Sequence, residues 1–583
     1  MKKILFALLL ISMMLSMMSL CINDGSITPE NKGDFKISES PRTFCNPLNL
    51  NYRFMKGEKG AREAADPVVV EYKGKYYLFA SKSSGYWYTE NFRTWTHVFI
   101  SDSVLPIEDY APGNFVYDGF LYYVGSSSGR GTLYRSSNPD QGEWEKVKDI
   151  WSFWDPAFYI EGDDLYIYHG CSPTNPIMVQ VLDLYTLEDK TERIECFNSN
   201  KEIHGWERRG EYNELSTRPF IEGAWMTAHK GKYYLQYAAP GTQWNSYADG
   251  VYVGDSPVGP FYYMENSPVS YKPSGFIGGA GHGSLFMVKE KNYWKAATNS
   301  ISSRHKFERR LSLFPAGIDD DGYMYTNTYL GDYPMFLPSI EGKDCRPDWM
   351  LLSYNKPVTT SSNLDGYPKE NAVDENVRTS WVASSNTEGE WITIDLLVSS
   401  LIHAIQVNFS EEGSTHQGYR EDIYQSYTIS ASNDGKKWYL IVDKSNKRTD
   451  TPHDYIEFEE PFKARYIRLE NKRYTVAPYF SLRDLRVFGK GSGCKPVAIE
   501  NFIVQRNPND PCKATLKWNA TKGAEGYIIR YGTKKDKLYN NFQIWEKTML
   551  NINSLNSGVP YYFTIDTYNS NGVTPGEKII KSL

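Results

Sequence analysis

Three acidic residues in the first half of the chain stand in apolar, turn-like sequence rather than in charged runs. Asp66 and Asp155 each precede a proline, and Glu222 precedes Gly223. A single acid beside Pro or Gly is most often a turn residue. Three such acids predict acid–base chemistry if the fold brings them together.

Carboxyl groups of this kind could hydrolyse a glycosidic bond. One carboxylate would activate water and one protonated acid would release the leaving group, with roughly 6.5–9.5 Å between them when configuration inverts. The acid must keep its proton near neutral pH, which apolar surroundings or a nearby negative charge achieve by raising its pKa. Glu222, which follows Phe220 and Ile221, is the best candidate for that acid.

A recurring hairpin supplies elements that could position these acids. Residues 74–81 are a turn followed by an aromatic, alternating strand, and the pattern returns at 118–125, 163–168, 231–237 and, more weakly, 291–295. The period is roughly 45–70 residues, the size of a four-stranded blade. The sequence therefore predicts a five-bladed β-propeller, with a double β-sandwich as the alternative. Each acid would lie near the start of a blade's first strand, beside the central channel.

The order and spacing of Asp66, Asp155 and Glu222 resemble the catalytic trio of glycoside hydrolase family 43, over about residues 46–327. The family's fold is the five-bladed propeller, and its members invert configuration on furanosides or xylosides. The resemblance implies that Asp66 is the general base and Glu222 the general acid. It implies that Asp155 modulates the pKa of the acid and orients it.

Further residues extend this resemblance. His282, in Gly-His-Gly-Ser, resembles a family histidine at the channel centre, which contacts substrate or lies near a metal ion or its waters. Arg309 resembles an arginine that contacts sugar hydroxyls, although the adjacent Arg310 leaves this choice open. Trp154 and Trp225 are candidates for stacking on a sugar, with core packing as the alternative.

No cofactor is expected to be required, and a structural Ca²⁺ ion is the one metal considered. Calcium prefers oxygen ligands, so His282 would act on it through water. The acidic turn at residues 319–322 lacks the ligand spacing of a calcium loop and is predicted to be a solvated hairpin.

Two further β modules are predicted after the propeller, which spans residues 41–346. Residues 347–492 resemble a discoidin-like (F5/8 type C) jelly roll, the fold of carbohydrate-binding module family 32, through the motifs at 371–381 and 464–469. Sugar binding and a spacer role both stay open for it. Residues 493–583, with Trp518 and strands at 526–531 and 561–565, resemble a fibronectin type III sandwich and are expected to be a spacer. The predicted fold class is thus all-β throughout.

The N-terminus predicts export. Lys2 and Lys3 precede an apolar run that ends at Cys21, as in a bacterial lipoprotein signal peptide at residues 1–21, with a polar tether at 22–40. We expect a protein anchored to the cell-envelope membrane by a lipid on Cys21, in the periplasm or at the cell surface. Ordinary secretion and a retained anchor are the alternatives. The other cysteines form no CxxC motif, and their pairing stays open.

The composition limits the classes of binding partner that we expect. A net charge of −6 does not favour nucleic acid binding, and aromatic residues are 15% of the chain, which suits β-structure and sugar stacking. We expect a monomer that removes terminal furanosyl or xylosyl residues from a plant or microbial polysaccharide or its oligosaccharides. The family resemblance favours α-L-arabinofuranosidase first and β-D-galactofuranosidase or β-xylosidase next. The competing class is a non-catalytic glycan-binding surface protein.

Overall fold

The computed structural model describes residues 35–126, 131–151, 153–340 and 345–582. In these ranges every regular element is a β-strand except three short 3₁₀-helices, Pro139–Gln141, Gly205–Glu207 and Lys369–Ala372. The all-β prediction is therefore confirmed. No helix among the described residues has the length and apolar character needed to cross a bilayer.

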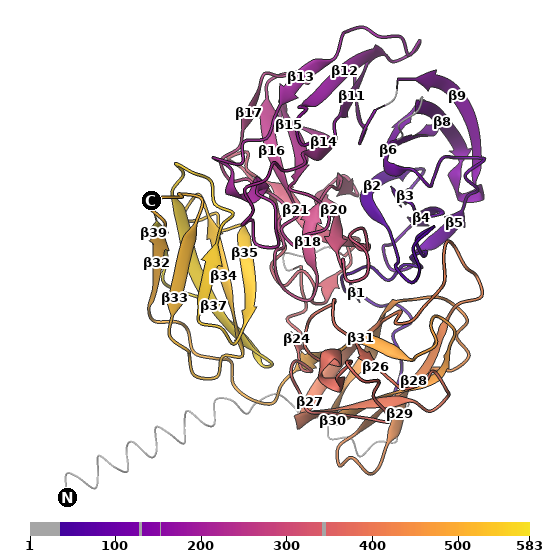
Figure 1. The fold of residues 1–583 in the computed structure, drawn as a ribbon, viewed down its shortest axis with the longest axis vertical. Coiled ribbons are helices and arrows are strands. Elements are labelled where there is room, and N and C mark those ends of the chain that lie inside the picture. Colours follow the sequence, from indigo (N-terminus) through magenta and orange to yellow (C-terminus); the bar gives the residue numbers. More distant parts are fainter. Residues whose placement is uncertain (1–34, 127–130, 152, 341–344, 583) are drawn as a thin grey trace, which may run out of the picture.

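Five antiparallel sheets form the propeller (Figure 1). Blade 1 holds β2 (Ala65–Tyr72), β3 (Lys75–Ser81), β4 (Gly85–Thr89) and β5 (Thr96–Phe99), and blade 2 holds β6 (Tyr110–Tyr117), β7 (Phe120–Ser126), β8 (Gly131–Asn138) and β9 (Glu143–Ile150). Blade 3 holds β10 (Ala157–Glu161), β11 (Asp164–His169), β12 (Ile177–Asp183) and β13 (Ile194–Phe197), and blade 4 holds β14 (Glu222–His229), β15 (Lys232–Ala239), β16 (Ala248–Gly254) and β17 (Phe261–Tyr263). Blade 5 holds β18 (Gly278–Gly281), β20 (Asn292–Ser300), β21 (Arg309–Ile318) and β22 (Met324–Thr326), and β19 (Leu285–Val288) also pairs with β20. The pair β1 (Thr43–Phe44) and β23 (Met335–Phe336) joins the two ends of the propeller region.

The repeated hairpins of the sequence correspond to the second strand of each blade, β3, β7, β11, β15 and β20. The first strands lie inside them, and those of neighbouring blades contact one another: β6 contacts β2 and β10, and β10 contacts β14. β2 also contacts the second strand of blade 5, β20. The prediction that the acids lie at the start of first strands is confirmed for Asp66 in β2 and Glu222 in β14, while Asp155 comes two residues before β10.

The second module is one sheet that two long, bent strands run through, β27 (Trp391–Phe409) and β30 (His453–Tyr474). Around them lie β24 (Met350–Leu351), β25 (Val358–Thr360), β26 (Trp381–Val382), β28 (Gln425–Ser432), β29 (Tyr439–Lys444) and β31 (Ser481–Lys490). The buried Trp381, Ile392 and Leu469 belong to its core, so the motifs found in the sequence are core motifs.

The C-terminal module is a two-sheet sandwich. One sheet holds β32 (Phe502–Arg506), β33 (Ala514–Trp518) and β36 (Met549–Ile552), and the other holds β34 (Gly526–Gly532), β35 (Asn540–Trp545), β37 (Tyr561–Asn569), β38 (Gly572–Thr574) and β39 (Ile580–Ser582). This agrees with the predicted β-sandwich, while its fibronectin type III assignment stays a prediction.

Both modules pack closely on the propeller (Figure 1). The carboxylate of Glu411 in the second module contacts Arg62 of the propeller at 2.8 Å and its own module's Arg483 at 3.0 Å, and all three side chains are buried. The C-terminal sandwich shares an apolar core with blades 3 and 4 that includes Trp206 and Trp518. The three units are therefore a single packed assembly.

Two predictions about flexible or solvated segments need correction. The turn at 319–322 is not simply solvated, because Asp319 accepts a hydrogen bond from Tyr539 at 2.7 Å and pairs with Lys537 of the C-terminal sandwich at 2.9 Å. Residues 35–38, predicted as tether, lie against the second module, where Phe35 contacts Phe462. The signal peptide, Cys21 and residues 22–34 of the tether lie outside the described residues.

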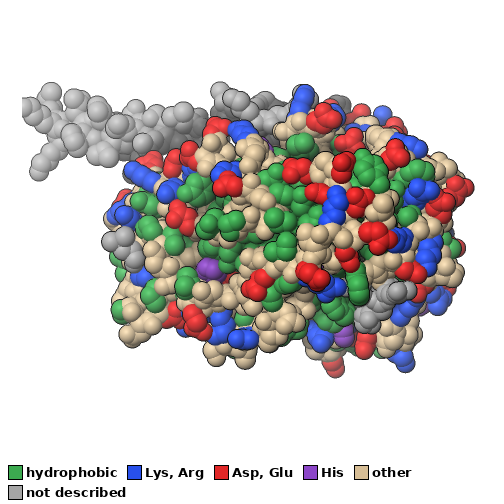
Figure 2. Space-filling model, turned by 90° about the horizontal axis from the view of Figure 1, so that it is seen from above, with side chains coloured by type: hydrophobic (Ala, Val, Ile, Leu, Met, Phe, Trp, Pro, Cys, Tyr) green, Lys and Arg blue, Asp and Glu red, His purple; other side chains and the backbone are tan. Residues whose placement is uncertain are grey.

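Figure 2 shows Lys and Arg side chains interspersed with Asp and Glu side chains on one face of the molecule, rather than gathered by sign. Five cysteines, Cys45, Cys171, Cys196, Cys345 and Cys512, are free thiols.

Candidate active site

Irregular backbone at the start of the first strands aims the acidic side chains. The β2–β3 register shifts between Ala65 and Val68, and the β14–β15 register shifts between Glu222 and Trp225. Asp66 and Asp155 have φ angles of 55° and 51°. Aspartate tolerates this left-handed conformation better than most residues, and bulges commonly redirect a side chain beside an active site.

Hydroxyl groups from neighbouring blades hold this irregular backbone. The amide of Asp66 donates to Oγ1 of Thr298 at 2.7 Å, and the amide of Asp155 donates to Oγ of Ser126 at 2.9 Å. Ser81 donates to Oδ2 of Asp66. Both aspartates are thus fixed through groups on the second strands β20, β7 and β3.

The three predicted acids meet around one histidine. Nδ1 of His282 lies 3.2 Å from Oδ1 of Asp66 and 3.7 Å from Oδ2 of Asp155. Oδ2 of Asp155 also accepts a hydrogen bond of 3.2 Å from the amide of Gly223, the residue after Glu222. Carboxylate oxygens of Asp155 and Glu222 lie within 4.8 Å of each other. Acids from blades 1, 3 and 4 therefore share one site.

His282 is itself held by buried charges. Its amide donates to Oδ1 of Asp249 at 2.7 Å, and the other carboxylate oxygen of Asp249 pairs with the fully buried Lys295 at 2.5 Å. Because an unpaired buried charge is costly, this pair keeps Asp249 in place beneath the histidine backbone.

Each oxygen of Glu222 has its own partner. The hydroxyl of Tyr247 donates to Oε1 at 2.6 Å, and the thiol of Cys171 lies 3.2 Å from Oε2. Sequence analysis missed Tyr247 and Cys171, because they lie in loops outside any recognisable motif. Only their position in the fold reveals them.

Strand alternation decides between the two adjacent arginines. Nη1 of Arg309 lies 3.6 Å from Oδ2 of Asp66, and its Nη2 lies 2.8 Å from Oε1 of the buried Glu63. Arg310 points to the opposite face of β21, where its Nε donates to Nε2 of His453 in the second module at 2.9 Å. Arg309 is therefore the arginine at the site, and Glu63 is a further residue that sequence analysis missed.

The two tryptophans differ in their placement. Trp154 precedes Asp155 and is 46% exposed, so its ring is available to a ligand. Trp225 packs in a core cluster with Leu285 and Met324, and its Nε1 donates to the carbonyl of Leu285 at 3.1 Å. Trp225 is thus packed against this cluster, and contact of its ring with a sugar stays a prediction.

Burial and mutual charge alter the titration of the site. Burial, with the negative charges of Glu222 and Asp66, raises the pKa of Asp155 to about 7, and the positive charge of His282 opposes this. Burial disfavours the imidazolium of His282, but Asp66, Asp155 and Glu222 outweigh it and raise its pKa. The site therefore binds protons near neutral pH, as general acid–base chemistry needs.

This arrangement does not suit His282 as a direct metal ligand, and its predicted role through water stays a prediction. Its Nδ1 faces two carboxylates, and the raised pKa favours the imidazolium, which has no free lone pair for a metal. Asp155, Cys171 and Glu222 are the group of described residues whose ligand atoms are close enough to surround an ion. Since two of these are predicted to control proton transfer, we assign them to acid–base chemistry, and the structural Ca²⁺ stays a prediction without an assigned site.

Two known families match the chain. Residues 60–324 match the family described as glycosyl hydrolases family 43, and residues 357–484 match the F5/8 type C domain. The first match contains all three acids, His282 and Arg309.

Two curated relatives match parts of the chain. A β-D-galactofuranosidase (xynD) of Aspergillus niger is 24% identical over 181 residues, which are 30% of this chain and 49% of that protein. Lactadherin of Rattus norvegicus is 26% identical over 131 residues, which are 21% of this chain and 30% of that protein. The chain thus spans half or less of the length of each relative.

Solved structures with similar folds include a thermostable family-43 glycoside hydrolase, with 22% identity and a TM-score of 0.41 over 51% of this chain and 100% of that one. A xylan β-1,4-xylosidase from Bacillus halodurans has 14% identity and a TM-score of 0.39, covering 71% of this chain and 100% of that one.

Proposed function

We propose that this protein, whose residues 60–324 form a family 43 glycosyl hydrolase domain, is an exo-acting glycoside hydrolase that inverts configuration. The observation that carries the proposal is the meeting of Asp66, Asp155 and Glu222, from three different blades, around His282. Inverting hydrolysis needs a base and an acid on opposite sides of one glycosidic bond, and we propose Asp66 and Glu222 for these two roles.

In the proposed reaction Asp66 removes a proton from the attacking water. The positive groups of Arg309 and His282 lie beside its carboxylate and face the negative charge that makes it a base. Glu222 gives its proton to the departing glycosidic oxygen. General acid–base catalysis of this kind contributes roughly 10²–10⁴-fold to the rate.

Asp155 acts on the acid through position and charge. Its Oδ2 accepts the amide of Gly223 and so fixes the backbone next to Glu222, and its carboxyl group lies against that of Glu222. A negative charge on Asp155 would disfavour loss of the Glu222 proton, which is the modulator role expected from the sequence.

We propose a terminal furanosyl or xylosyl residue of a polysaccharide or oligosaccharide as the substrate, with α-L-arabinofuranose first. The name of the Aspergillus relative supports β-D-galactofuranose as the second candidate. Trp154, exposed beside the site, is proposed to stack on the sugar, and Arg309 to contact its hydroxyls.

Release of p-nitrophenol from aryl α-L-arabinofuranoside, β-D-galactofuranoside and β-D-xyloside tests the proposal, with Glu222→Gln as the inactive control. We expect release from one furanoside above all, lost in the control. If no glycoside is cleaved while glycan binding persists, the non-catalytic glycan-binding protein becomes the better account.

We also propose that the protein is a monomer exported to the cell envelope and held there by a lipid on Cys21. The charged Lys2 and Lys3 and the apolar run before Cys21 support this. A Cys21→Ala variant should leave the membrane fraction; a variant that stays membrane-bound would contradict the anchor.

A further inference from the structure

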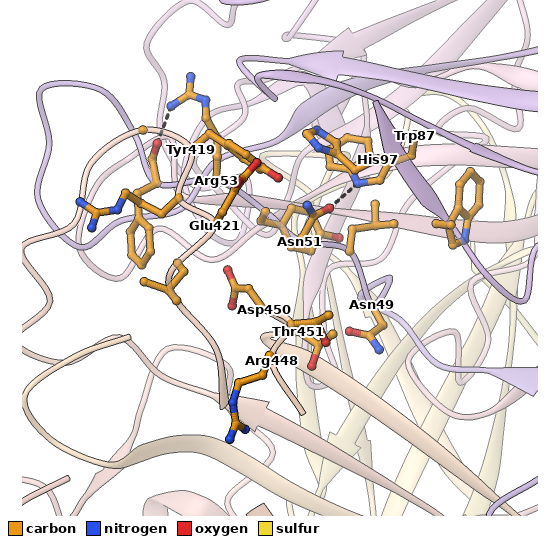
Figure 3. A pocket seen from close by; sticks show the side chains of 18 residues that line it. Asn49, Asn51, Arg53, Trp87, His97, Tyr419, Glu421, Arg448, Asp450 and Thr451 are labelled. Carbon is orange, nitrogen blue, oxygen red and sulfur yellow. Dashed lines mark hydrogen bonds between the residues drawn. The ribbon is translucent and has the colours of Figure 1, made fainter. Parts of the chain in front are cut away.

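A cleft of about 430 Å³ lies where blade 1 meets the F5/8 type C domain, away from the three acids. The propeller contributes residues 49–54 together with Trp87, Trp95 and His97. The second module contributes residues 418–423 and 448–451. Figure 3 shows Asn49 and Asn51 on the propeller side and Asp450 and Thr451 on the module side of one space. Its volume is within the range of small-ligand sites.

Aromatic rings line this cleft. Tyr419 stacks on His97 with ring centroids 5.3 Å apart and an interplanar angle of 29°. His97 in turn lies 5.2 Å from Trp87, and the partly buried Trp95 is a further lining ring. Trp87 is only 1% exposed, so the partly exposed Tyr419 and Trp95 are the rings whose faces can bind the C–H surface of a sugar ring.

Three buried polar atoms of the lining residues have no hydrogen-bond partner: Oδ1 of Asn49, Nε of Arg53 and Nδ1 of His97. Arg53 is only 3% exposed. Burial lowers the pKa of His97 to about 4, so its ring is neutral at physiological pH. Nε2 of that ring contacts the carbonyl of Ser83, which leaves Nδ1 as an acceptor. Since unsatisfied buried groups are costly, a ligand with groups that both donate and accept is favoured here.

Three of the charged side chains that line the cleft, Arg53, Arg420 and Asp450, are in ion pairs, and the other two, Glu421 and Arg448, are of opposite sign. Arg53 pairs with Glu108 at 2.6 Å, and Asp450 pairs with Arg62 at 2.5 Å. The lining therefore carries no excess of one sign that would select an ionic ligand. A neutral, ring-shaped ligand with hydroxyl groups matches this lining. Its C–H surface fits the aromatic rings of the cleft, and its hydroxyl groups fit the unpartnered polar atoms of the cleft.

We propose that this composite cleft is a second glycan site that binds a neutral oligosaccharide segment. This proposal rests on the proposed action of the protein on polysaccharide. The cleft wall is joined to the active site through the chain, because the carbonyl of Arg53 accepts the amide of Glu63, and Glu63 pairs with Arg309. A polymer held here stays beside the blade that carries Asp66, which raises its local concentration at the site.

Titration calorimetry of the full chain carrying Glu222→Gln tests the proposal. The probes are arabinan- and xylan-derived oligosaccharides of about six sugars, large enough to fill a pocket of this class. We expect two binding sites with at least one of the probes. Adding Tyr419→Ala removes stacking area and should abolish one site or weaken it about tenfold, equivalent to 1.4 kcal/mol.

Tyr262→Ala is the matched control, because Tyr262 is 68% exposed on β17 and does not line the cleft. Tyr419→Phe should retain the site, and Asn49→Ala should weaken it without removing a ring. A single site in the parent, or two sites unchanged by both Tyr419→Ala and Asn49→Ala, would overturn the proposal.

Turnover of aryl glycosides by chains with an intact Glu222 separates this proposal from the proposed function. Tyr419→Ala should leave their kcat/KM within about twofold, because these small substrates need only the catalytic pocket. If the parent chain does not cleave aryl glycosides but Tyr419→Ala still weakens oligosaccharide binding, the hydrolase proposal fails and the second site stands. If turnover is normal but Tyr419→Ala does not change oligosaccharide binding, the second site fails and the hydrolase proposal stands.

Discussion

The pKa values of Asp155 and His282 are both raised, and these two residues lie between the proposed base and the proposed acid. Burial raises the pKa of Asp155 to about 7 from an ordinary value of 3.8. The folded state therefore holds this proton more tightly than the unfolded chain. The resulting stabilisation is complete below the ordinary pKa and is lost as the pH rises through about 7.

An Asp155→Asn variant removes this titration. Relative to the wild type, its free energy of unfolding should increase between pH 4 and pH 8 by up to roughly 4 kcal/mol, because a shift of one pKa unit corresponds to about 1.4 kcal/mol. Urea unfolding at both pH values measures this, with Asp66, Glu222 and His282 unchanged in both proteins. A stability difference that does not vary with pH would contradict the raised pKa of Asp155.

Cys171 is a positioning residue for the proposed acid, since its thiol contacts Oε2 of Glu222 at 3.2 Å. Cys171→Ala should lower kcat by about threefold to tenfold with little change in KM, because a hydrogen bond between neutral groups is worth roughly 0.5–1.5 kcal/mol. Cys171→Ser, which keeps a donor, should recover most of the rate and the alkaline limb of the pH–rate profile. Equal rates for the alanine variant and the wild type would remove this role.

At this scale the sequence predicted the residues that carry local motifs. Asp66, Asp155, Glu222, His282 and Arg309 all lie at the site. The packing of Trp225 could not be predicted, because a tryptophan near an acid gives no information on which face of the strand it occupies. Tyr247 and Cys171 could not be predicted, because they reach Glu222 from loops 25 and 51 residues away.

At the scale of elements, the bulges in the first strands direct side chains of the blades toward the site. Gly223 has a φ of +62°, and a Cβ there would lie 2.5 Å from Cγ of His282. The glycine therefore permits both the local turn and the close approach of the histidine.

Gly223→Ala should displace His282 and lower kcat/KM by about 100-fold, the loss expected when a catalytic group moves by roughly 1 Å. Gly231→Ala is the matched control, since Gly231 lies in the next turn of the same blade with a φ of +75° and no atom within 4 Å of its added Cβ. The control should lose only about 1–2 kcal/mol of stability and keep its activity. Normal turnover in Gly223→Ala would show that the close approach is not required.

The hairpins were predictable because a turn followed by an alternating aromatic strand is a local signal. The bulges were not, because a register shift depends on the partner strand. Asp66 and Asp155 adopt left-handed backbone that hydroxyls of Thr298 and Ser126 hold from other blades.

At the scale of the whole molecule, the F5/8 type C domain is fixed to the propeller rather than tethered to it. Glu411 is buried, and although burial opposes its charge, Arg483, Arg62 and Arg310 outweigh this and lower its pKa strongly. Arg62 and Glu411 are 349 residues apart, so no local pattern could predict this contact. The domain therefore contributes structure as well as the proposed second glycan site.

Glu411→Gln removes the negative charge that a cluster of buried arginines shares and should destabilise the protein by roughly 3–5 kcal/mol. Glu412→Gln is the control, because Glu412 is partly exposed and pairs with Arg304 at 2.9 Å, and a pair of this kind is worth about 1 kcal/mol or less. Thermal and urea unfolding measure both. Similar losses for the two variants would show that the buried cluster does not fix the domain.

The anomeric configuration of the first sugar released tests the proposed chemistry most directly. Proton NMR during the first minutes of hydrolysis of the best aryl furanoside, before mutarotation, should show a product of inverted configuration, and Glu222→Gln should release none. A product of retained configuration would contradict the assignment of Asp66 as the base that activates water, and with it the proposed roles of the three carboxyl groups.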